Sequence, residues 1–240
     1  MISRIANLLL GAAMAACLSV PSAHAQEAVS LELLLAIDVS ASVDADEFDL
    51  QKEGIVEAFQ DPGILEAVLG QDGVAVAVML WAGAASPRPL VVEWSMLVDQ
   101  GAVDGFLGAV AEIRRPSGFP SSTAIGNAIE DGARYILDND IEGTRRVVDI
   151  SADGKMNDGV PAAPARDAAA VRGVTINGLA VLDDEPDLEV YFRDHVVTPD
   201  GFVQVAGDYE DFIRAMASKL WQEIAELPAP DAVQVAELPY

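Results

Sequence analysis

The amino-acid sequence predicts an α/β domain with a doubly wound, mostly parallel central sheet and helices on both faces. Apolar runs of strand length alternate along the chain with longer segments whose apolar residues recur at helical spacing. The strand-like runs are continuously apolar, as expected where helices cover both faces of a sheet. Hydrophobic residues make up 51% of the chain, so its 240 residues can bury one large core.

The first half of the chain supplies three strands and two helices. LELLLAI at 31–37 is predicted as a buried strand. Residues 44–59 are predicted as an amphipathic helix with acidic residues in its first turn, where the helix dipole favours them. Two further strands follow at 74–82 and 89–96, and a helix follows at 98–113.

In the second half, the loop RRPSGFPSS is broken by proline and glycine and precedes a helix that opens at Thr123. The remaining predicted elements are a strand at 145–151, a helix at 166–173, a strand at 174–181, a short helix at 188–196, a strand at 201–206 and a helix at 208–225.

The first residues have the layout of a secretory signal peptide. Arg4 precedes an uncharged apolar stretch, and Ala-His-Ala ends at Ala25, where we expect cleavage. The apolar stretch is shorter than the roughly 20 residues that span a bilayer. We therefore predict a signal peptide at 1–25, one domain at 26–225 and a flexible tail at 226–240. The mature protein is expected to be secreted across the inner membrane, to be periplasmic or extracellular, and not to insert stably in the membrane.

The composition is strongly acidic, with 39 aspartates and glutamates against 14 lysines and arginines. Removal of the predicted signal peptide takes away Arg4 and changes the net charge from −25 to −26. It also removes Cys17, the single cysteine, so no disulfide is expected to support the core. The charge argues against binding to nucleic acid, which requires basic patches, and against binding to anionic membranes. We expect a monomer.

Small oxygen-bearing side chains follow the first predicted strand at alternate positions. Asp38, Ser40 and Ser42 lie in DVSAS, and residues two apart in an extended segment project to the same side. Thr123 stands at the start of a helix, and Asp153 follows the strand at 145–151. Ligand sites of doubly wound sheets lie beyond the carboxyl ends of the strands. We therefore expect these five residues to meet there.

Their chemistry predicts a site for a hard divalent cation. Two carboxylates and three hydroxyls suit Mg²⁺, with Mn²⁺ and Ca²⁺ as alternatives. Softer metals usually take imidazole or thiolate, and the mature chain offers one histidine, His195, and no cysteine. Two carboxylates neutralise a divalent ion, and small hydroxyls leave room for an outside oxygen. We therefore expect a cation with one open coordination position.

These motifs resemble the metal-ion-dependent adhesion site (MIDAS) of the von Willebrand factor type A domain. Asp38, Ser40 and Ser42 match its Asp-x-Ser-x-Ser motif, Thr123 in PSSTAIG matches its threonine, and Asp153 in ISADG matches its second aspartate. The likeness covers about residues 31–225, and the chain also resembles a bacterial group of secreted, uncharacterised single-domain proteins of this type. It implies a Rossmann-like fold and a bound cation. It further implies that the serines and threonine touch the ion, that the aspartates often act through water, and that a partner carboxylate fills the open position.

Simpler interpretations of the same residues stay open at this point. Asp38 and Ser42 could cap the helix that follows, Thr123 could be a helix cap only, and Asp153 could be an ordinary turn residue. The stretch DVSASVDADEFD also resembles a helix-loop-helix calcium loop, but it has valine and aspartate where that loop has its sixth-place glycine and twelfth-place glutamate.

The sequence thus predicts a secreted binding or adhesion module that captures a protein partner through a metal ion, and not an enzyme. Two alternatives belong to other classes. One is a metal-dependent hydrolase, although His195 is accompanied by no Gly-x-Ser-x-Gly motif. The other is a scaffold or assembly module in which the metal site is degenerate.

Overall fold

The computed structural model describes residues 27–118, 120–183 and 185–225. The signal peptide predicted at 1–25 and the tail predicted at 226–240 lie outside these residues, so both stay predictions, as do the domain boundaries. No helix in the described ranges is both long and apolar enough to cross a membrane.

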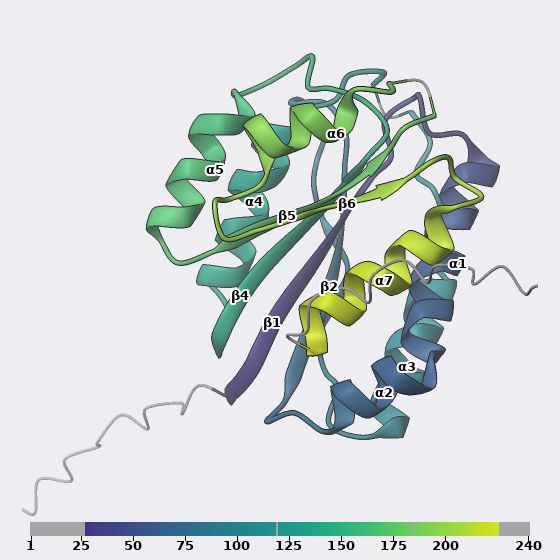
Figure 1. Ribbon diagram of the computed structural model, residues 1–240, viewed down its shortest axis with the longest axis vertical. Helices are drawn as coiled ribbons and strands as arrows, with labels where there is room; N and C mark the ends of the chain where they lie inside the picture. The colour runs from purple at the N-terminus through teal and green to yellow at the C-terminus, as the bar shows by residue number, and fades with distance from the viewer. Residues whose placement is uncertain (1–26, 119, 184, 226–240) are drawn as a thin grey trace, which may run out of the picture.

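A single six-stranded sheet forms the centre of the domain, in the order β3-β2-β1-β4-β5-β6 (Figure 1). Every pair of neighbouring strands is parallel except β2 and β3, which are antiparallel. The predicted doubly wound, mostly parallel sheet is therefore confirmed. The strands are β1 (Glu27–Asp38), β2 (Val74–Trp81), β3 (Leu90–Met96), β4 (Ile141–Ala152), β5 (Thr175–Val181) and β6 (Val203–Ala206).

Helices cover both faces of this sheet (Figure 1). One face carries α1 (Ala45–Gln60), α2 (Pro62–Leu69), α3 (Gln100–Ala111) and α7 (Phe212–Ala225). The other carries α4 (Ile125–Leu137), α5 (Ala162–Val171) and α6 (Leu188–Tyr191), which continues into the π-helical turn η1 (Phe192–Val196).

The central strand β1 shows why the strand-like runs are continuously apolar. Leu33 and Leu35 pack into the core on the α1 and α7 side, whereas Leu34 and Ala36 pack into the core on the α4 and α5 side. All four side chains are buried. A strand that is covered on both faces needs apolar residues at successive positions, and not at alternate ones.

Two local features differ from the sequence predictions. Helix α2 was not predicted, although Asp61 accepts hydrogen bonds from the Gly63 and Ile64 N–H groups and proline occupies the first turn. The cap of α1 is Asp44, which forms a reciprocal capping box with Glu47. The interpretation of Asp38 or Ser42 as a helix cap is therefore wrong.

Strand ends place the predicted site residues along one edge of the sheet. Asp38 ends β1 and pairs in register with Trp81, the last residue of β2. Ile37 pairs with Ser151, close to the end of β4. A strand rather than a helix thus precedes DVSAS, which also removes the helix-loop-helix calcium interpretation. The carboxyl ends of β1, β2 and β4 form a common rim for the loops that follow them.

Candidate metal site

The segment after β1 folds back on itself through its own polar groups. The Ser40 N–H donates to Asp38 Oδ1 at 2.7 Å, and the hydroxyls of Ser40 and Ser42 are 3.1 Å apart. The Val39 N–H donates to the Trp81 carbonyl at 2.9 Å, which keeps this segment at the sheet edge. Asp38 and Ser40 are fully buried, whereas Ser42 is exposed.

Asp153 meets this segment directly. It is the first residue after β4, and its Oδ1 accepts a hydrogen bond from the Ser42 hydroxyl at 3.0 Å. The bond joins residues that are 111 positions apart in the chain. Two of the three predicted motifs are therefore in contact.

The backbone places Thr123 at the same edge. The Ala124 N–H donates to the carbonyl of Ala82, the residue after β2, at 3.1 Å. On the other side, Asn157 Oδ1 accepts from the Thr123 N–H at 2.9 Å, and the Asn157 N–H donates to the Thr123 carbonyl at 3.0 Å. Thr123 is thus held between the end of β2 and the loop that carries Asp153. Helix α4 has Ala124 at its cap position without a side-chain cap bond, so the cap interpretation of Thr123 is wrong.

The electrostatics of this cluster are unbalanced. Burial, followed by the negative charge of Asp153, raises the pKa of Asp38 to about 7, although the Ser40 N–H and Arg115 act in the opposite direction. Asp38 Oδ2 is buried and, among the described residues, has no hydrogen-bond partner. A buried carboxylate oxygen with no donor is costly. Two carboxylates beside small hydroxyls are a donor set that a hard divalent cation fits.

The hydroxyls are essential to this fit. Within the ranges that the structure describes, no group of three or more histidine, cysteine, aspartate or glutamate residues could hold a metal ion. A cation at this edge would therefore rest on serine and threonine oxygens as well as on carboxylates.

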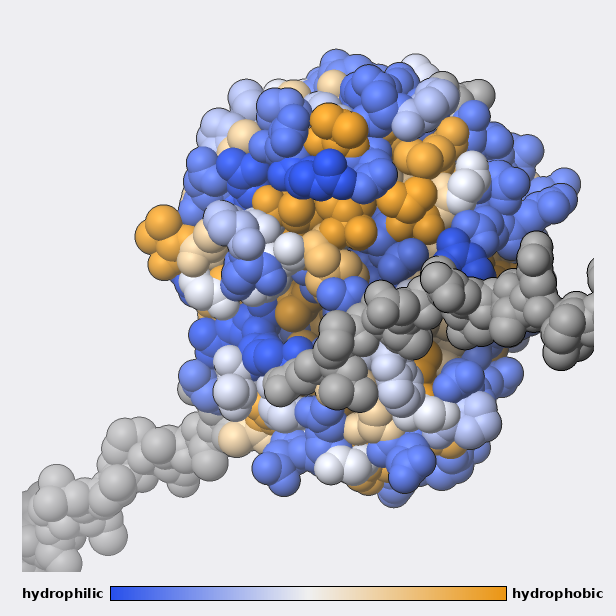
Figure 2. All heavy atoms as spheres, viewed as in Figure 1, coloured by the Kyte–Doolittle hydropathy of each residue, from blue (hydrophilic) through white to orange (hydrophobic). Residues whose placement is uncertain are grey.

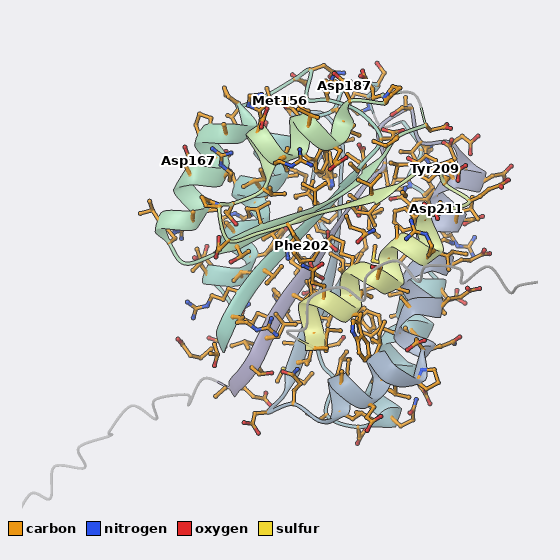
Figure 3. The ribbon with its side chains drawn as sticks, in the orientation of Figure 1. Met156, Asp167, Asp187, Phe202, Tyr209 and Asp211 are labelled. Atoms are coloured by element: carbon orange, nitrogen blue, oxygen red, sulfur yellow. The ribbon has the colours of Figure 1, made fainter. Side chains whose placement is uncertain are left out.

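Two further side chains, Arg115 and Tyr209, belong to the site and were not predicted. Arg115 lies in the loop between α3 and α4, and its Nη2 donates to the Ser40 carbonyl at 3.1 Å. Tyr209 lies in the turn before α7 (Figure 3). Its side chain forms a hydrogen bond with Asp153. Burial, followed by the negative charges of Asp153 and Asp38, raises the pKa of Tyr209 above its ordinary value, so the phenol remains a donor. Neither residue lies in a recognisable motif, and both reach the site through the tertiary fold.

Replacement of Tyr209 by phenylalanine should destabilise the cation-free protein by about 1–2 kcal/mol, because it removes a donor from a charged acceptor. The free energy of unfolding in urea, with chelator present, measures the loss. Tyr135→Phe is the matched control, since the Tyr135 hydroxyl donates to the uncharged carbonyl of Arg88 at 3.0 Å. A loss for Tyr209→Phe that is no larger than that of Tyr135→Phe would contradict this prediction.

Comparisons with solved structures identify the fold. The chain is similar to proximal thread matrix protein 1 from the mussel byssus with a zinc-occupied MIDAS motif, at 13% identity and a TM-score of 0.56, over 80% of this chain and 47% of that one. It is similar to the pilus adhesin SpaC from Lactobacillus rhamnosus GG, at 12% identity and a TM-score of 0.61, over 82% and 30%. It is also similar to a von Willebrand factor type A structure from Catenulispora acidiphila, at 18% identity and a TM-score of 0.54, over 80% and 43%.

The chain covers less than half the length of each of these three proteins. At such identities the likeness shows the fold alone, which is that of the von Willebrand factor type A domain. A search of curated protein sequences finds no match. The sequence matches the family described as "Protein of unknown function (DUF1194)" over residues 28–228. Because this match spans most of the chain, the protein belongs to the DUF1194 family and carries a domain of the von Willebrand factor type A fold.

Proposed function

We propose that the protein is a secreted binding module that captures a protein partner through one divalent cation. The proposed ligands of the cation are Asp38, Ser40, Ser42, Thr123 and Asp153. The expected ion is Mg²⁺, with Mn²⁺ or Ca²⁺ as alternatives, and a carboxylate of the partner would complete its coordination. The protein acts by binding and not by catalysis.

The observation that carries the proposal is the unpartnered oxygen of Asp38. Asp38 Oδ1 is fixed by the Ser40 N–H, whereas Oδ2 is buried without a donor among the described residues. The charge of Asp153 raises the energy of the ionised Asp38 further. A divalent cation would offset both effects at once, which hydrogen bonds from neutral groups would do less well.

The likeness to known structures supports the same conclusion. One of the similar proteins is described with a zinc-occupied MIDAS motif, and another is described as a pilus adhesin. Oxygen donors without imidazole or thiolate favour Mg²⁺ over zinc in this chain. When bound, the cation would supply a Lewis-acidic position for an oxygen of the partner. The cation would be held in place by the hydroxyls of Ser40 and Ser42 and by the two carboxylates.

A melting experiment tests the proposal. Mg²⁺, Mn²⁺ or Ca²⁺ should stabilise the wild-type protein by about 2.7 kcal/mol at one hundred times the dissociation constant. Asp38→Asn should abolish this increment. In chelator, the same variant should melt above the wild type, because it removes a buried charge that faces Asp153 and keeps an acceptor for the Ser40 N–H.

Asp44→Asn is the matched control. It removes a negative charge two residues beyond Ser42, but asparagine caps a helix about as well as aspartate does. This variant should retain the cation-dependent increment. If millimolar amounts of all three ions leave the wild-type melting curve unchanged, the proposed function is wrong.

A further inference from the structure

Arg115 places a positive charge against the backbone of the proposed metal site. Its Nη2 donates to the carbonyls of Ser40 and Val39, at 3.1 and 3.4 Å. Both acceptors are neutral oxygens of the segment that carries three of the proposed ligands. The guanidinium is therefore fixed beside the site without its charge being cancelled by these bonds.

The influence of Arg115 reaches the site itself. Its Nη2 contacts the carbonyl of Ser40, and the N–H of the same residue donates to Asp38 Oδ1 at 2.7 Å. An arginine side chain carries a permanent positive charge in proteins. A cation that approaches Asp38 and Asp153 therefore meets two negative charges and one fixed positive charge.

A local charge count shows what this arrangement does to a loaded site. With both carboxyl groups ionised, Asp38, Asp153 and Arg115 together carry a net charge of −1, and a divalent cation changes this to +1. The protein as a whole carries −25. Glu47 is close enough to Asp153 for the two carboxylates to repel each other, so with its charge included the loaded site is neutral with Arg115 and negative without it. Charges beyond about 8 Å are largely screened at 0.15 M salt.

We infer that Arg115 is a fixed counter-charge that weakens the hold of the site on a free cation and removes the net negative charge by which the loaded site would repel an anionic partner group. The inference rests on the proposed function, which it deepens. It explains how a strongly acidic protein could capture a carboxylate: the loaded site does not repel it, and the repulsion by the remaining acidic residues is screened. It also means that cation and carboxylate should favour each other's binding, since each offsets the charge left by the other.

If Arg115 had a structural role only, the expected effect of replacing it on cation binding would be the opposite. If the guanidinium serves only to hold the loop after β1, its replacement should loosen Ser40 and weaken cation binding. If it acts through its charge, removal of the charge should strengthen cation binding, because repulsion between two cations is relieved. The sign of the change separates the two roles.

The experiment is calorimetric titration of the full chain with Mn²⁺ alone. Arg115→Gln keeps a donor for the two carbonyls and loses the charge, and it should bind Mn²⁺ about tenfold more tightly than the wild type. Arg115→Lys keeps the charge and should stay within about threefold of the wild type. Arg114→Gln is the matched control, since Arg114 is the exposed neighbour in the same loop. Its effect should be smaller and should vanish at high salt, unlike that of Arg115→Gln.

The outcomes separate this inference from the proposed function. Tighter binding by Arg115→Gln alone supports the inference. Binding by Arg115→Gln that is equal to or weaker than that of the wild type overturns it, and leaves the proposed metal site standing. If neither the wild type nor Arg115→Gln takes up Mn²⁺, Mg²⁺ or Ca²⁺, the proposed function fails and the inference fails with it.

Discussion

Replacement of Lys219 by methionine is expected to lower the free energy of unfolding by about 3–5 kcal/mol. Lys219 lies on α7 and is 0% exposed. Its Nζ is 2.7 Å from Asp149 Oδ1 on β4 and 2.5 Å from Glu223 Oε1 one turn along the helix. Asn177 on β5 donates to the same Glu223 oxygen at 2.9 Å. The ammonium also lies 5.2 Å from the ring of Phe202, which Figure 3 labels between β5 and α7.

The size of the loss follows from what the variant leaves behind. Methionine fills a similar volume, but Asp149 and Glu223 would remain buried without the ammonium that lies between them. Burial already raises the pKa of Asp149 to about 7, and Lys219 acts against that shift. Without Lys219 this pKa should rise further. A carboxyl whose folded pKa is raised adds stability below its unfolded pKa and loses it as the pH rises through the folded value. The deficit of Lys219→Met should therefore be larger at pH 8 than at pH 5.

Two controls isolate the buried charge. Lys52→Met removes the charge of a lysine of α1 that pairs with the exposed Asp49 and lies 5.5 Å from the centre of the Phe48 ring, and it should change stability by no more than about 1 kcal/mol. Asp149→Asn in the Lys219→Met background should recover part of the loss, because it removes one of the stranded charges. Urea unfolding followed by circular dichroism at both pH values measures all three variants. If Lys219→Met loses no more free energy of unfolding than Lys52→Met, or if its loss does not depend on pH, the prediction is wrong.

This buried network marks a limit of sequence analysis. The periodicity of residues 208–225 predicted an amphipathic helix, which the structure has at Phe212–Ala225, but it assigns lysine and glutamate to the solvent side. Lys219 and Glu223 instead lie on the buried side, because Asp149 and Asn177 on two strands supply their partners. A pairing between segments this distant in the chain leaves no local pattern. The fold class was predictable because it depends on the order and polarity of whole elements.

The residues of the proposed metal site also fall into two groups, those that the sequence reveals and those that it does not. Asp38, Ser40 and Ser42 could be singled out because they are close in sequence and follow a strand. Arg115 and Tyr209 could not, because only the folded chain brings them to these residues.

The polarity of the surface agrees with the amino-acid composition. On the face shown in Figure 2, hydrophilic residues surround scattered hydrophobic patches, as 39 acidic residues in the chain would suggest.

Replacement of Gly126 by alanine is expected to cost about 3 kcal/mol of stability. Gly126 lies in the first turn of α4, and a Cβ atom there would be 2.1 Å from the carbonyl oxygen of Val160. The obstacle is backbone, so no side-chain rotation can relieve it. The Val160 N–H also donates to Asn127 Oδ1 at 3.0 Å, which holds helix and loop at this short distance. The variant must therefore push α4 and the loop of Val160 apart.

The same separation should act on the proposed metal site, because Thr123 leads into α4 and Asp153 begins the loop that contains Val160. We expect Gly126→Ala to lose most of the cation-dependent rise in melting temperature, in addition to its lower stability in chelator. Gly108→Ala on α3 is the matched control, since a Cβ there meets no atom within 4 Å. It should be neutral or stabilise by up to about 1 kcal/mol and keep the full cation response. If Gly126→Ala and Gly108→Ala have the same melting temperature, the close approach of α4 to this loop does not hold the two motifs together.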